Sequence, residues 1–84
     1  MSEENVIKVY STPTWPYCTT AKEFLSSAGA EYVELDVSKD REALIEMVEM
    51  SGARSVPVIT GGGQVIVGFD KEKITAMIES MKNA

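Results

Sequence analysis

The hydrophobic positions of this chain recur with a period of two in some stretches and of three to four in others. Four stretches have the pattern of strands, namely residues 6–10, 31–37, 56–60 and 64–67. The first is hydrophobic on both faces except at Lys8, which is typical of an inner strand of a parallel sheet. The second alternates, with Val33, Leu35 and Val37 on one side. Glycines at 61–63 separate the last two stretches and indicate a hairpin.

Two helices are predicted between these strands. The first begins at Pro16, a residue suited to the first helical position, and stops at Gly29. Its inward face contains Cys18, Ala21, Leu25 and Ala28, with Phe24 beside them. The second is expected to be capped by Ser38 and to end at Gly52. Its hydrophobic face contains Leu44, Met47 and Val48, flanked by Ile45.

A third helix closes the chain and has the clearest start. Asp70 is its predicted cap, and Phe69 before it can pack on Ile74 as a hydrophobic staple. The hydrophobic stripe of this helix contains Ile74, Met77, Ile78 and Met81. The element order is β-α-β-α-β-β-α, which predicts an α/β fold with a four-stranded mixed sheet and helices on both faces, formed by residues 1–84 as a single domain.

Composition restricts the chemistry. The chain has 84 residues, a formal net charge of −5, one cysteine and no histidine. The acidic balance disfavours nucleic acid and membranes as partners, and residues 1–5 lack the basic and hydrophobic regions of a signal peptide. We therefore expect a cytoplasmic monomer. One thiol without histidine excludes an internal disulfide, a Cys–His dyad and a structural zinc site, so no metal is expected.

The candidate chemistry lies in residues 11–18, Ser-Thr-Pro-Thr-Trp-Pro-Tyr-Cys, which join the first strand to the first helix. In an α/β sheet this is the functional edge. N–H groups at a helix N-terminus favour the thiolate form of Cys18, whereas burial disfavours it. Trp15 stands where a C-x-x-C motif would have its first cysteine. Cys18 is therefore either a redox thiol or a small buried hydrophobic residue.

Three segments resemble the glutaredoxin branch of the thioredoxin-fold family. Residues 11–18 resemble the active-site loop that ends in C-P-Y-C, here W-P-Y-C. Arg54-Ser55-Val56-Pro57 resembles the T-V-P segment, whose proline follows a cis peptide bond. Residues 61–70 resemble a late glycine-rich element that leads to a helix-capping aspartate. The resemblance implies the thioredoxin fold, thiol–disulfide exchange in cell redox homeostasis, and no firmly bound cofactor, with glutathione as co-substrate.

The resemblance also implies the site. The catalytic residue would be Cys18, and the substrate or glutathione site would contain Thr12, Trp15, Tyr17, Arg54, Val56, Pro57, Gly68 and Asp70. Two positions depart from the family pattern. Thr12 replaces a basic residue that helps to hold a glutathione carboxylate, and Trp15 replaces the attacking cysteine. An iron–sulfur cluster is not expected, because its protein ligand would stand at Trp15.

These observations predict a redox protein that acts through Cys18 on glutathione or on a protein thiol or disulfide, with reduced activity. With one sulfur it could form only mixed disulfides, resolved by an external thiol. Two alternatives stay open. One is a non-catalytic module that binds an extended peptide through Trp15 and through the backbone of Val56 beside Pro57. The other is a redox sensor in which Cys18 oxidises or joins a second chain.

Overall fold

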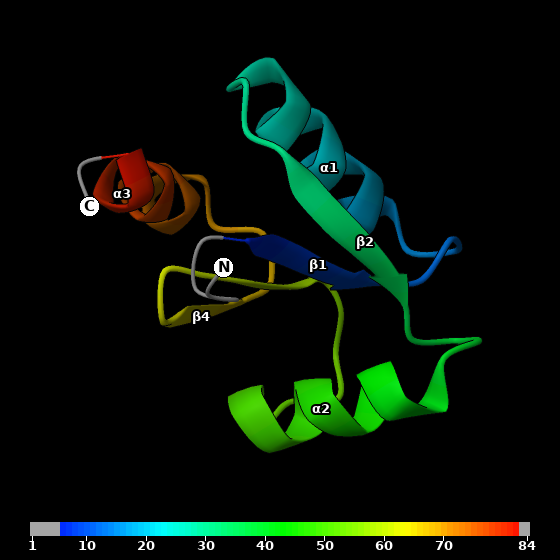
Figure 1. The fold of residues 1–84 in the computed structure, drawn as a ribbon. Helices are drawn as coiled ribbons and strands as arrows, with labels where there is room; N and C mark the ends of the chain where they lie inside the picture. Colours follow the sequence, from blue (N-terminus) through cyan, green and yellow to red (C-terminus); the bar gives the residue numbers. More distant parts are fainter. Residues whose placement is uncertain (1–5, 83–84) are drawn as a thin grey trace.

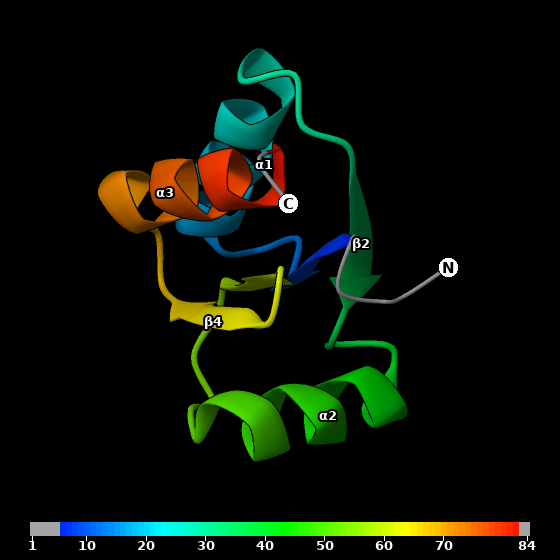
Figure 2. The same ribbon diagram turned by 60° about the vertical axis from the view of Figure 1, so that its left-hand side comes forward.

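The computed structural model describes residues 6–82. Its elements follow the predicted order. They are β1 (Ile7–Ser11), α1 (Pro16–Ser27), β2 (Tyr32–Asp36), α2 (Arg41–Ser51), β3 (Val58–Gly61), β4 (Gln64–Val67) and α3 (Lys71–Lys82). Figure 1 shows α1 and α3 on one side of the strands and α2 on the other, and the turned view in Figure 2 shows the same arrangement.

The strands form one mixed sheet with the order β2-β1-β3-β4. β1 pairs in parallel with β2, so that Ser11 faces Asp36, and antiparallel with β3. β3 pairs antiparallel with β4 through the glycine hairpin. Because β1 is an inner strand, its carboxyl end lies in the middle of the sheet edge, and the loop from Thr12 to Trp15 leaves from there.

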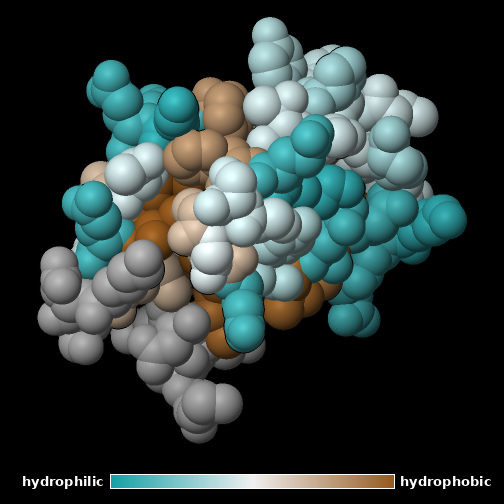
Figure 3. Space-filling view, turned by 90° about the horizontal axis from the view of Figure 1, so that it is seen from above, coloured by the Kyte–Doolittle hydropathy of each residue, from teal (hydrophilic) through white to brown (hydrophobic). Residues whose placement is uncertain are grey.

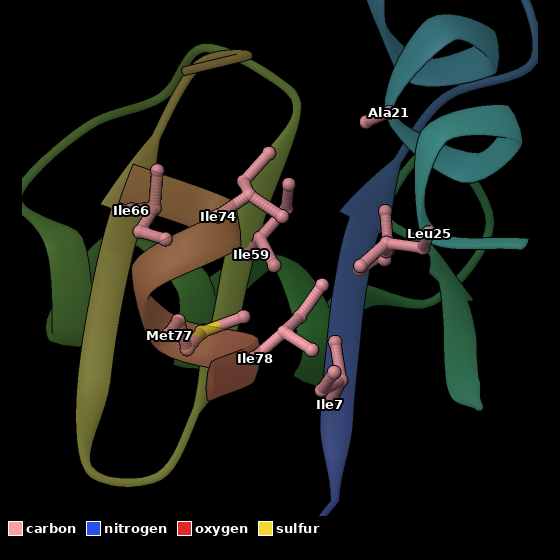
Figure 4. Packing of buried hydrophobic residues seen from close by; sticks show 9 residues of the cluster. Ile7, Ala21, Leu25, Ile59, Ile66, Ile74, Met77 and Ile78 are labelled. Carbon is pink, nitrogen blue, oxygen red and sulfur yellow. The ribbon is translucent and has the colours of Figure 1, made fainter. Parts of the chain in front are cut away.

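Two hydrophobic clusters lie on opposite faces of this sheet. The cluster under α1 and α3 contains Ile7, Val9, Ala21, Leu25, Ile59, Ile66, Ile74, Met77 and Ile78. Figure 4 shows that the α3 side chains of this cluster approach those of the sheet, with Leu25 of α1 near Ile7 of β1. The cluster under α2 contains Tyr10, Val37, Ala43, Met47 and Val58. The hydroxyl of Tyr10 also donates a hydrogen bond to the carboxylate of Glu46, which ties α2 to β1.

The helices on the first face also contact each other. The rings of Phe24 and Phe69 meet edge to face, with centroids 5.9 Å apart, and the Lys71 ammonium lies 5.8 Å from the Phe24 ring centroid. Phe69 packs against the cluster that includes Ile74, as the predicted staple requires. Seen from above in Figure 3, hydrophobic side chains show between the hydrophilic ones over this face.

Helix ends follow local chemistry, and one prediction is wrong. Asp70 caps α3, since its carboxylate accepts a hydrogen bond of 3.1 Å from the Lys73 N–H. The cap of α2 is Asp40 and not Ser38. The hydroxyl and N–H of Ser38 both donate to the Asp36 carboxylate, so Ser38 belongs to the turn after β2. Gly52 ends α2 with a φ of 70°, which a glycine adopts without strain.

Two strand predictions also need correction. β3 begins at Val58 rather than at residue 56, since Pro57 has no N–H and its carbonyl accepts a hydrogen bond from the Gly68 N–H at 2.8 Å. Val33 was expected to share a buried face with Leu35 and Val37, but it is exposed. β2 is an edge strand, and only its later residues reach the cluster under α2.

Candidate functional site

The loop between β1 and α1 positions Trp15 and Cys18. Trp15 is the cap residue of α1, with extended backbone and no side-chain cap, and Pro16 follows it at the start of the helix. The Trp15 N–H donates to the Thr12 carbonyl at 3.4 Å, and the Cys18 N–H donates to the Trp15 carbonyl at 3.1 Å. These bonds form the tight turn that starts the helix and place the cysteine in its first turn.

Cys18 and its aromatic neighbours differ sharply in exposure. Cys18 is 1% exposed and lies on the buried face of α1 with Ala21 and Leu25. Trp15 is 49% exposed and Tyr17 is 61% exposed. The surface of this loop is therefore aromatic, and the sulfur lies beneath it.

A groove of about 330 Å³ opens beside Trp15. It is lined by Thr12, Trp15, Val37, Ser38, Leu44, Arg54, Ser55 and Val56. The groove brings together four of the predicted binding residues from two segments that are far apart in the sequence. Thr12 and Trp15 come from the first segment, and Arg54 and Val56 come from the second. Among residues 6–82, no hydrogen bond engages the backbone N–H or carbonyl of Val56. The groove offers an extended ligand an aromatic side chain, a cation and free main-chain groups.

The other predicted site residues lie outside this groove. Tyr17 is exposed on the first turn of α1, and Pro57, which follows Val56, is buried. The peptide bond between Val56 and Pro57 is cis, which confirms that prediction. Gly68 and Asp70 lie between β4 and α3, joined to the segment before β3 by the bond from Gly68 to Pro57. A binding role for these residues stays a prediction.

Four groove residues were missed as site residues: Val37, Ser38, Leu44 and Ser55. A signal for two of them was present in the sequence. Val37 and Ser38 directly follow β2, which is parallel to β1, and parallel strands end at the same edge of a sheet. Leu44 was assigned only to the core, and it is half-buried.

Hydrogen bonds shift the pKa values of two side chains near the end of β2, Asp36 and Lys22. The bonds from the Ser38 hydroxyl and N–H to the Asp36 carboxylate hold the pKa of Asp36 below its ordinary value. The Lys22 ammonium lies 2.7 Å from the Glu34 carboxylate, and this hydrogen bond raises the pKa of Lys22. The same carboxylate accepts a hydrogen bond of 3.2 Å from the buried Ser11 hydroxyl, next to the start of the loop.

Within residues 6–82, no three histidine, cysteine, aspartate or glutamate side chains are grouped in a way that could hold a metal ion. The same residues include no helix of the length and hydrophobicity needed to cross a bilayer.

Comparison with known proteins identifies the family. A family model described as glutaredoxin matches residues 7–66. A glutaredoxin-like 8.6 kDa protein from the rubredoxin operon of Clostridium pasteurianum is 43% identical over 74 residues, 88% of this chain and 99% of the relative. Glutaredoxin 3 of Escherichia coli K12 is 38% identical over 64 residues, 76% of this chain and 77% of the relative.

A solved structure supports the same assignment. The glutaredoxin of Archaeoglobus fulgidus superposes with a TM-score of 0.80 at 26% identity, over 86% of this chain and 84% of that chain. This likeness and the observed element order confirm the predicted thioredoxin fold. The chain belongs to the glutaredoxin family of redox proteins.

Proposed function

We propose that the chain exchanges thiols and disulfides with glutathione or a protein thiol through Cys18, more slowly than a protein with an exposed attacking cysteine. The observation that carries this proposal is the placement of the only cysteine in the first turn of α1, three residues after Trp15, which lines a groove that includes four of the predicted binding residues. Membership of a redox family supports the same chemistry.

The exchange needs one protein sulfur and two external partners. The Cys18 thiolate attacks a disulfide, a new bond forms between Cys18 and one substrate sulfur, and the other sulfur leaves as a thiolate. An external thiolate of the glutathione class then attacks the substrate sulfur of this mixed disulfide. Cys18 returns as a thiolate, and the external sulfur and the substrate sulfur share the new disulfide. Electrons therefore come from the external thiol, and protons exchange with water.

Burial sets the rate of the first step. With Cys18 at 1% exposure, a disulfide can reach the sulfur only after the first turn of α1 or the loop before it opens. The groove would meanwhile hold the substrate. The free backbone groups of Val56 suit an extended peptide, Arg54 suits a carboxylate, and Trp15 suits an apolar or planar group.

A second candidate is a peptide-binding module without redox chemistry. The observation that favours it is the contrast between the buried sulfur and Trp15, which is 49% exposed at the edge of the groove. In that case, the groove would bind extended peptides and Cys18 would serve as a core residue.

Three variants separate the two candidates. Disulfide reduction coupled to glutathione should be measurable in the wild type and absent in Cys18→Ser. Trp15→Cys restores an attacking sulfur at an exposed position, and its activity should exceed that of the wild type by at least roughly 10-fold, since access no longer limits the step. Equal background rates in the wild type and in Cys18→Ser would reject exchange through Cys18. Peptide or glutathione binding that survives Cys18→Ser but is lost in Trp15→Ala would then establish the binding module.

A further inference from the structure

A second hollow lies along one side of α2. It encloses about 520 Å³ and is lined by Arg41, Leu44, Ile45, Val48, Glu49 and Arg54. We call these residues the α2 surface. The inner side of the same helix is buried through Ala43 and Met47, and the α2 surface flanks this buried side.

The α2 surface is more hydrophobic than a solvated helix face. Ile45 is 47% exposed, and Leu44 and Val48 beside it are half-buried. Single exposed hydrophobic residues are common on proteins, but here the exposed Ile45 shares one concavity with Leu44 and Val48, which are half-buried because they also pack against the cluster under α2. A hollow of this kind accepts an apolar side chain of a partner.

Charge selects the kind of partner. The sequence has two arginines, Arg41 and Arg54, and both line the α2 surface of a molecule whose formal net charge is −5. Glu49 is the carboxylate residue among the lining residues. No described carboxylate lies within 4.0 Å of either guanidinium, so both can pair with a partner. Guanidinium groups bind carboxylates through two parallel hydrogen bonds, which favours an acidic ligand.

The α2 surface is continuous with the groove beside Trp15. Leu44 and Arg54 line both hollows, so a ligand that leaves the groove past Arg54 enters the α2 surface directly. Resting on the function proposed above, we propose that the α2 surface docks an acidic, extended segment of the protein partner whose thiol or disulfide is presented at Trp15. A carboxylate of this segment pairs with Arg41 or Arg54, and an apolar side chain covers Leu44, Ile45 and Val48.

This docking distinguishes a protein partner from glutathione. Glutathione carries carboxylates but has no large apolar side chain, so it can use Arg54 but gains little from Ile45 and Val48. A protein segment with an acidic and a branched or aromatic residue uses both features. The α2 surface therefore directs the chain toward protein partners with acidic segments.

The test uses a peptide without cysteine and the full chain. The probe is acetyl-Glu-Leu-Glu-Phe-Ser-amide, and its matched control has lysine at both glutamate positions. Backbone NMR shifts of Ile45 and Val48 report binding to the α2 surface. The acidic peptide should shift both signals, with an affinity that falls between 50 and 500 mM salt, whereas the basic peptide should not.

Variants assign the contacts. Arg41→Gln and Arg54→Gln should each weaken acidic-peptide binding by roughly 2- to 5-fold, the range for exposed ion pairs. Ile45→Ser should weaken it by roughly 10-fold through loss of apolar contact. Lys73→Gln removes one positive charge on the opposite face of the sheet, and Val33→Ser removes an equally exposed hydrophobic side chain on β2. Both controls should leave binding unchanged.

The outcomes separate this proposal from the proposed function. Equal binding of acidic and basic peptides, shifts confined to other elements, or no binding would overturn docking at the α2 surface, even if glutathione still perturbs Trp15 and exchange still occurs. Binding of the acidic peptide with the stated variant losses supports docking. This support for docking holds even if Cys18→Ser and the wild type reduce disulfides at the same background rate. Equal rates would reject only the redox chemistry.

Discussion

Cys18 and Trp15 are three residues apart, and the fold gives them opposite surroundings. The first turn of α1 directs Cys18 toward the sheet, and the loop before it leaves Trp15 at the edge of the groove. In the exchange proposed above, access to the Cys18 sulfur sets the rate, so that activity depends on how often this sulfur becomes reachable.

Burial of Cys18 predicts slow alkylation. In the native chain iodoacetamide should modify Cys18 at least roughly 10-fold more slowly than in urea at the same pH, because local opening must precede reaction and costs more than about 1.4 kcal/mol. The rate is followed by mass spectrometry. Thr19→Cys in a Cys18→Ser background places the thiol at an exposed neighbouring position and should react at nearly the denatured rate. Equal native and denatured rates for Cys18 would show that it is accessible.

Ser38 controls the ionisation of Asp36. Ser38→Ala removes the hydroxyl donor and keeps the Ser38 N–H bond, so the lowered pKa of Asp36 should rise toward its ordinary value. A carboxyl whose pKa is lowered in the folded state stabilises the fold above its ordinary pKa. That contribution is lost as pH falls through the lowered pKa. Carbon-13 NMR titration of the Asp36 carboxyl measures the change, with Ser55→Ala as the matched groove variant. An unmoved pKa in Ser38→Ala would contradict this assignment of cause.

At the scale of elements, α3 combines a structural cap with a predicted binding residue. Asp70→Ala should cost about 1 kcal/mol of unfolding free energy, because the Lys73 N–H loses its acceptor. Asp70→Asn keeps a cap and should cost almost nothing. If Asp70 also binds glutathione through its charge, both variants should lose affinity. Asp40→Ala, which removes the cap of α2, should match Asp70→Ala in stability and keep that affinity.

Urea unfolding and glutathione titration make this comparison. Full glutathione affinity in Asp70→Asn would reduce Asp70 to a structural cap. Full stability in Asp70→Ala would show instead that its hydrogen bond to Lys73 is replaced by water.

The elements themselves were largely predictable because their signals are local. Asp70 and the stripe that begins at Ile74 specify α3, and the hairpin glycines specify β4. The start of α2 was mispredicted because two residues competed for one role. Asp36, the last residue of β2, accepts both donors of Ser38, and Asp40 is left to cap the helix. The spacing of residues along the sequence does not show which aspartate accepts the hydrogen bonds of Ser38.

The groove was less predictable than the elements. Thr12, Trp15, Arg54 and Val56 were selected by resemblance, and only the tertiary fold shows that they share one cavity. The burial of Cys18 was left open by the sequence, because a helix N-terminus can present a residue to solvent or to the sheet. The α2 surface was not predicted, since the spacing of Leu44 and Val48 is equally that of a buried face.

For the whole molecule, the two clusters should unfold together. β1 and β3 supply residues to both, so neither cluster can persist without the sheet. Met77→Ala and Met47→Ala, one in each cluster, should each cost about 2–5 kcal/mol. Met50→Ala, at an exposed position, should stay within about 0.5 kcal/mol. Circular dichroism and fluorescence of the single tryptophan should give coincident transitions in urea. Separate transitions would show that the faces of the sheet fold independently.

The edges of the sheet have a consequence for behaviour in concentrated solution. β2 and β4 are the edge strands, and exposed valines lie on both, at positions 33, 65 and 67. Strand edges of this kind can pair between molecules. The formal charge of −5 makes neighbouring molecules repel one another at neutral pH, and this repulsion vanishes near the isoelectric point of about 4.6. Colloidal stability should therefore reach its minimum in buffer near this isoelectric point.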